Sequence, residues 1–174
     1  MQRLPLAAML IVCLVPTFGQ SQPSGLPDEK VFRYFFLHVT AADSVADTLR
    51  AKGKDDRFAR TAIRSEANLT NREIEIVKAT AQRCNADYGA ETALGMAEVG
   101  DLRRQYPPPS QGSSQPPPQV AQRINALDQR RDAVIAGCIQ NLKAQMGERR
   151  FRALHDWVLR AEGPKIKQVV AGKR

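Results

Sequence analysis

The two histidines are the first candidates for chemistry in this sequence of 174 residues. His38 and His155 each lie in an apolar stretch with the pattern of a helix. Neither has cysteine, aspartate or glutamate neighbours that complete a compact set of metal ligands. A lone histidine on an apolar helix face is usually a core or boundary residue, so the sequence predicts no metal site.

The acidic pairs Asp28–Glu29 and Asp55–Asp56 are the other candidates for catalysis. Adjacent residues of a helix point in different directions, so neither pair forms a carboxylate dyad. Acidic residues suit the first turn of a helix, which is the simpler interpretation of both pairs. The sequence has no glycine-rich phosphate loop, no GxSxG and no Cys–His nucleophile arrangement. We therefore expect a non-enzymatic protein without a cofactor.

The first 19 residues have the layout of a secretory signal peptide. Arg3 precedes an apolar run, Leu4–Val15, and small residues stand at the −3 and −1 positions of a cleavage site after Gly19. The run is shorter than the roughly 20 residues that a membrane span needs. The alternative is lipidation at Cys13, but that cysteine lies inside the run and follows a bulky valine. The sequence predicts a periplasmic or secreted protein.

Removal of residues 1–19 leaves two cysteines, Cys84 and Cys138. An even number of cysteines in an exported chain indicates a disulfide. The alternative is two buried free thiols. There is no CxxC motif, so redox catalysis is not expected.

Apolar periodicity predicts an all-α fold of four to five helices in one domain, 28–164. The expected helices are 28–52, 55–66, 70–106, 119–146 and 148–161, and Gly163-Pro164 is expected to end the last one. A flexible N-terminal segment, 20–27, precedes the domain and a basic tail, 165–174, follows it. The segment 107–118, PPPSQGSSQPPP, is a low-complexity linker that cannot be helical.

Three groups of apolar residues are expected to face the core. The run Val31–Val39 is apolar on nearly every side, so it is predicted to be enclosed, or otherwise to line a groove for a partner. Phe58 and Ala62 would face inward from the second helix, with Ile63 as a further candidate. The 3–4 spacing from Ile74 to Tyr88 predicts a seam against an antiparallel helix, which Leu94 would continue.

Helix geometry tests the disulfide. Cys84 lies 22 residues before Tyr106, and Cys138 lies 20 residues after Pro118. At 1.5 Å per residue, the cysteines lie roughly 33 and 30 Å from the tip of a helical hairpin. They would therefore be level on facing helices, which predicts the pairing Cys84–Cys138.

The segment Leu69-Thr70-Asn71-Arg72-Glu73-Ile74 is the clearest local motif. Thr70 and Glu73 can form a capping box, with Leu69 and Ile74 as a hydrophobic staple around it. The segment resembles the LTxxQ motif of small periplasmic helical proteins of the Spy/CpxP type, with Glu73 in place of the glutamine. Met146–Phe151 is similar to the helix-break-helix region near the end of such chains. The resemblance implies an envelope-stress chaperone or sensor that forms a cradle-like dimer of long helices.

Charge gives the second functional hypothesis, since the net charge is +8. Export makes nucleic acid an unexpected partner and favours anionic envelope surfaces. The candidate patch comprises Arg149, Arg150, Arg152, Arg160, Lys165, Lys167, Lys173 and Arg174. The leading hypothesis is an envelope chaperone or stress-associated protein that binds unfolded or envelope proteins, with a homodimer left open. The alternative is a module that binds anionic envelope components through this patch.

Overall fold

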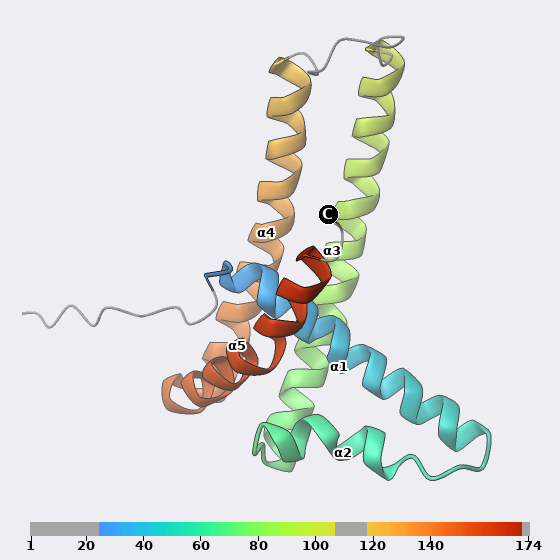
Figure 1. Ribbon diagram of the computed structural model, residues 1–174, viewed down its shortest axis with the longest axis vertical. Helices are drawn as coiled ribbons and strands as arrows, with labels where there is room; N and C mark the ends of the chain where they lie inside the picture. Colours follow the sequence, from blue (N-terminus) through green and yellow to red (C-terminus); the bar gives the residue numbers. More distant parts are fainter. Residues whose placement is uncertain (1–24, 107–117, 172–174) are drawn as a thin grey trace, which may run out of the picture.

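The fold is all-helical over the residues that the computed structural model describes, 25–106 and 118–171. The helices are α1 (Asp28–Ala51), α2 (Arg57–Glu66), α3 (Asn71–Gln105), α4 (Pro118–Met146) and α5 (Glu148–Ala171). Figure 1 shows α3 and α4 as two long antiparallel rods, with α1 and α5 lying across their lower halves. The predicted signal peptide, most of the flexible N-terminal segment and nearly all of the linker lie outside the described residues.

Local signals place several of the helix ends where the sequence predicts them. The Thr70 side chain accepts from the Glu73 backbone N–H, and the Glu73 side chain accepts from the Thr70 N–H, so the capping box is confirmed. Gly147 separates α4 from α5 with a φ of +78°, a left-handed conformation that glycine adopts without strain. Pro118 occupies the first turn of α4, where its missing N–H costs nothing.

The core forms where α1 crosses the hairpin and α5 covers the crossing. Five residues in the first half of α1 are almost completely buried: Val31, Phe32, Phe35, Phe36 and Val39. They pack with apolar side chains of the lower halves of α3 and α4 and with one face of α5. Because α1 contacts all four other helices, it is the centre of the domain.

The prediction that the run Val31–Val39 is enclosed on every side is wrong. Tyr34 and Leu37 are exposed, and Val45 further along α1 is exposed as well. The hairpin and α5 together cover only one side of α1, so its outer face stays open to water.

Two predicted inward-facing residues also lie on the surface. Phe58 is 83% exposed, whereas Ile63 is buried. Residues five apart in a helix lie about 140° apart around its axis, so the two side chains cannot face the same core. In α3, Leu94 is exposed and Gly95 takes the position in the seam against Leu127 of α4.

Helix α5 does not end at Gly163-Pro164, as the sequence predicted, but continues to Ala171. Proline has no N–H and strains a helix interior, so another interaction must hold the last turns in place. Glu162 and Ile166, on either side of the proline, are both buried. Tertiary packing against α1 therefore maintains the helix through a residue that would end it locally.

Candidate functional site

The disulfide divides the helical hairpin into a packed half and a free half. Cys84 and Cys138 are bonded, with Cα atoms 6.0 Å apart, as the helix geometry predicted. The main apolar cluster of the described residues reaches Cys84 on α3 and Ile135 on α4 and extends no further toward the tip. Beyond the bridge lie residues 89–105 of α3 and 118–133 of α4, here called the arm, which Figure 1 shows projecting from the rest of the molecule.

The arm is held together by few interactions. Its described buried residues are Gly95, Leu102 and Leu127. A Cβ at Gly95 would lie 2.9 Å from Leu127, so the glycine allows the two helices to approach closely. Arg130 of α4 donates to Glu91 at 2.6 Å and to Glu98 at 2.8 Å, which ties it to α3.

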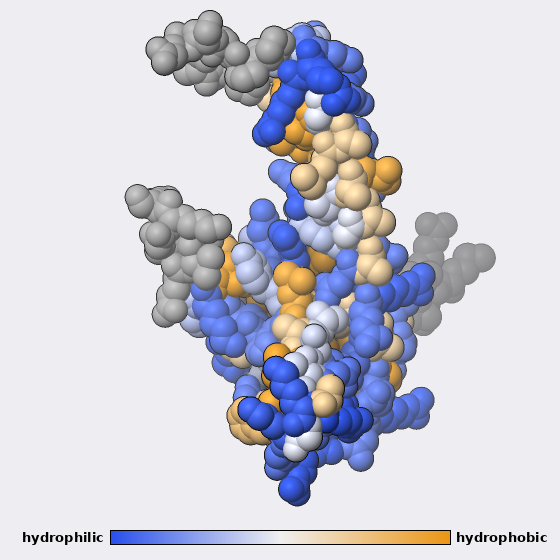
Figure 2. Space-filling model, turned by 90° about the vertical axis from the view of Figure 1, so that its right-hand side faces the viewer, coloured by the Kyte–Doolittle hydropathy of each residue, from blue (hydrophilic) through white to orange (hydrophobic). Residues whose placement is uncertain are grey.

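Large apolar side chains of the arm remain in contact with water. Leu94 and Met96 of α3 are 62% and 72% exposed, and Ile124 of α4 is exposed as well. Figure 2 shows hydrophobic surface over the upper part of the molecule, where the arm stands. Nothing in the described part of the chain covers these side chains, so they are available to a partner.

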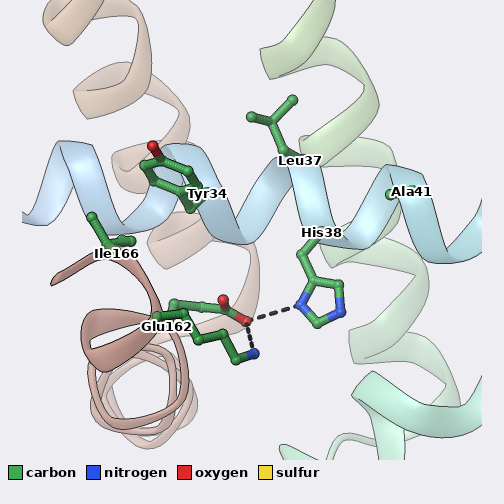
Figure 3. Close-up of a pocket in the computed structure, with 7 residues that line it drawn as sticks. Tyr34, Leu37, His38, Ala41, Glu162 and Ile166 are labelled. Atoms are coloured by element: carbon green, nitrogen blue, oxygen red, sulfur yellow. Dashed lines mark hydrogen bonds and ion pairs between the residues drawn. The ribbon is translucent and has the colours of Figure 1, made fainter. Parts of the chain in front are cut away.

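A groove of about 310 Å³ lies between the outer face of α1 and the last turns of α5. Tyr34, Leu37, His38 and Ala41 line it from α1, and Glu162, Lys165 and Ile166 line it from α5 (Figure 3). The Glu162 side chain is only 6% exposed. Its Oε1 atom accepts from Nδ1 of His38 at 2.9 Å and from Nζ of Lys165 at 3.2 Å.

Glu162 was not predicted as a site residue, although the sequence contains a signal for it. Four buried apolar residues of α5 are separated by three, four and eight positions: Phe151, Leu154, Val158 and Ile166. Glu162 lies halfway between the last two and therefore belongs to the same helix face. A carboxylate in an apolar stripe indicates a buried charge with a partner. The expectation that α5 would end before Gly163 hid this pattern.

Both histidines connect α1 with α5. His38 pairs with Glu162, and Nε2 of His155 lies 2.9 Å from a carboxylate oxygen of Asp28. The His155 ring also stacks on Phe32, with ring centres 5.7 Å apart. No group of three or more histidine, cysteine or acidic side chains within the described residues is arranged to hold a metal ion.

The capping box at the start of α3 is also a contact with α5. Arg150 donates to both carboxylate oxygens of Glu73, at 2.6 and 2.9 Å, and to the backbone oxygen of Asn68 at 2.9 Å. The Arg150 guanidinium is the main reason that the pKa of Glu73 falls to about 2. A bidentate pair of this kind fixes orientation as well as distance. The motif therefore anchors α5 to the turn between α2 and α3.

The eight basic residues of the predicted patch do not share one surface. Arg150 is bound by Glu73 and Lys165 by Glu162. Arg149, Arg152, Arg160 and Lys167 are exposed. Their spacing of three, eight and seven residues places these four on one face of α5. Lys173 and Arg174 lie outside the described residues.

The two acidic pairs have structural partners. Asp56 accepts from Arg60, which lowers the pKa of the aspartate, and Asp55 accepts from Arg57. Asp28 contacts His155, as described above. Glu29 lies in the first turn of α1, where an acidic residue suits the helix N-terminus. Asp55 and Asp56 have different partners.

None of the described helices is long and apolar enough to cross a membrane. No protein-family model matches the sequence, and neither a curated protein nor a solved structure is significantly similar to it. The surfaces of the chain itself are therefore the basis for its proposed function.

Proposed function

We propose that this protein is a non-enzymatic, exported protein of the envelope chaperone or stress-associated kind, which holds apolar segments of unfolded or envelope proteins on its arm. The predicted signal peptide would deliver it to the periplasm or the exterior. The disulfide supports this location, since disulfides persist in oxidising compartments. The observation that carries the proposal is the exposure of Leu94, Met96 and Ile124 on an arm that lies outside the core.

The chemistry of the arm suits clients of varied sequence. The methionine side chain is unbranched and flexible, so it adapts to irregular partners. Gly89 and Ala93 lie seven and three residues before Met96, on the same face of α3, and place no bulky side chain beside it. The disulfide closes the base of the arm, so a client can contact the arm without opening the core.

Aggregation of an unfolded client enzyme, followed by light scattering, tests this function. The disulfide-bonded protein is expected to suppress scattering at a few-fold molar excess. The double variant Leu94→Ser/Met96→Ser should lose at least half of that effect. The matched control, Val45→Ser/Phe58→Ser, replaces two exposed apolar side chains that lie away from the arm and should retain it. No suppression by the unaltered protein would contradict the function, and equal loss in both variants would contradict the role of the arm.

The alternative function is binding to anionic envelope components, and the outward face of α5 favours it. Arg149, Arg152, Arg160 and Lys167 lie along about 27 Å of one helix face. Each cation near an anionic membrane contributes about 1 kcal/mol to binding. Part of this attraction is offset because Arg152 pairs with Glu148 and Asp156 lies on the same face.

Sedimentation with lipid vesicles tests the alternative. Binding should require anionic lipid. It should weaken about a hundredfold in the variant Arg149→Gln/Arg160→Gln/Lys167→Gln, since the loss of three cations at about 1 kcal/mol each amounts to about 3 kcal/mol. Charge replacement is preferable to deletion of residues 165–174, because Lys165 and Ile166 pack on α1. Replacement of three exposed arginines elsewhere, Arg72, Arg83 and Arg123, is the control for net charge. Equal loss in both variants would indicate nonspecific attraction and contradict a dedicated patch.

A further inference from the structure

The groove between α1 and α5 combines a buried anion with apolar walls. The walls are formed by Tyr34, Leu37, Ala41 and Ile166. Glu162 is the acidic residue among the lining side chains, and 94% of its side chain is removed from water, since 6% is exposed. A carboxylate in such a place is stable only when hydrogen-bonded or paired with a cation.

The partners of Glu162 leave part of the carboxylate open. Within the described residues, both of its hydrogen bonds end on Oε1. Figure 3 shows the other carboxylate oxygen of Glu162 directed away from the His38 ring, with no dashed line to it. Lys165 is a replaceable partner, because 60% of its side chain is exposed and it is held by one contact of 3.2 Å. His38 approaches from the opposite side of the groove and orients the carboxylate.

We propose that this groove binds a primary ammonium group carried on an aliphatic chain, with Glu162 as its counter-ion. The ammonium would donate to the open oxygen of Glu162, and the methylene groups would cover Leu37, Ala41 and Ile166. A volume of about 310 Å³ is at the lower end of the range for small-ligand sites and accommodates a chain of several methylenes.

The geometry selects this chemistry over the other charged ligands. An anion would be repelled by Glu162. A guanidinium binds best when it donates to both oxygens of a carboxylate, but Oε1 already accepts two hydrogen bonds. An ammonium is a compact charge and needs only one oxygen. The same group can come from a free alkylamine or polyamine or from a lysine side chain of a bound protein, and the proposal does not depend on the function of the arm.

An NMR titration of the disulfide-bonded protein with hexylammonium tests the site. Saturable shifts are expected at the backbone amides of 37–41 and 162–166. Hexan-1-ol, which has the same chain and no charge, should bind at least tenfold more weakly, and hexanoate should produce no saturable shifts. Absence of saturable shifts with hexylammonium, or equal affinity for the alcohol, would overturn the proposal.

Three variants separate binding from folding. Glu162→Gln should weaken hexylammonium binding at least tenfold. Ala41→Leu fills the groove from an exposed position on α1 and should abolish binding while the helical circular-dichroism spectrum stays unchanged. Lys165→Gln removes the competing cation and should tighten binding several-fold, whereas a purely structural role for Lys165 predicts no gain. Unchanged affinity in Ala41→Leu would place the ligand elsewhere and refute the site.

Two further ligands distinguish the sources of the ammonium. One is spermidine, and the other is a capped apolar peptide with a single lysine, compared with the same peptide carrying norleucine. Tighter binding of spermidine assigns the groove to a free amine. A lysine-dependent advantage of the peptide assigns it to a protein partner. If spermidine, the lysine peptide and hexylammonium all fail to bind, the site is rejected. The proposed function of the arm, which the aggregation assay tests, would still stand.

Discussion

Reduction of the Cys84–Cys138 disulfide breaks one covalent bond and removes no side chain. The bridge closes a loop of 54 residues. A cross-link of that size lowers the entropy of the unfolded chain enough to contribute about 4 kcal/mol at 25 °C. Domains of this size have a total stability of about 5–15 kcal/mol. Reduction should therefore remove a large share of the stability without removing the fold.

Urea unfolding with and without reductant measures this contribution. With a denaturant dependence of about 2 kcal/mol per molar, the midpoint should fall by about 2 M on reduction. Circular dichroism follows the helices, and the fluorescence of Trp157 follows the core, since its ring centre lies 6.0 Å from that of Phe35. The two signals should shift together.

The control is the variant Cys84→Ala/Cys138→Ala, whose midpoint should not respond to reductant. The reasoning is refuted if reduction changes the free energy of unfolding by less than about 1 kcal/mol, because a 54-residue loop would then carry no entropic constraint. It is also refuted if both cysteines of the non-reduced protein react with an alkylating reagent after denaturation.

Replacement of Arg150 by Ala should lower the free energy of unfolding and therefore the urea midpoint at pH 7, because Glu73 loses the partner that donates to both of its carboxylate oxygens. Since the folded pKa of Glu73 is about 2, against an ordinary value of 4.5, its stabilisation is complete above pH 4.5 and is lost as the pH falls toward 2. Unfolding of Arg150→Ala should depend less on pH in that window, and an unchanged pH profile would contradict the role of the pair. Pro164→Ala should stabilise the protein by about 1 kcal/mol or more, since it restores a helical hydrogen bond, and a loss in thermal unfolding temperature would contradict this. Gly89→Ala should stabilise by about 1 kcal/mol because its Cβ meets nothing within 4 Å, whereas Gly95→Ala should gain less because its Cβ would lie 2.9 Å from a leucine of α4. Equal gains at the two glycines would argue against close packing in the arm.

The disulfide could be predicted because a helix has a fixed rise per residue. The positions of Cys84 and Cys138 relative to the proline-rich linker place them level on facing helices. The capping box at Thr70 and Glu73 was equally predictable, since its hydrogen bonds join residues three apart in the chain. That Arg150 would bind the same glutamate could not be predicted, because the two residues are 77 positions apart.

The sequence left a groove beside the run Val31–Val39 as the alternative to an enclosed helix, but it could not decide between the two or identify the opposite wall. Periodicity shows which residues share a helix face, but it does not show how many neighbouring elements cover that face. Tyr34 and Leu37 are exposed because only one side of α1 is covered by the hairpin and α5. The groove also requires α5 to continue past Pro164, which local propensity disfavours.

The sequence by itself determined the helices, their order and the pairing of the cysteines, because capping, turn residues and helical rise act over short distances. The tertiary structure alone decided which apolar residues would be buried and where α5 would end. Burial of Ile166 and pairing of Glu162 with His38 hold the last turns of α5 on α1. Those contacts join residues more than 100 positions apart, and only the folded chain brings them together.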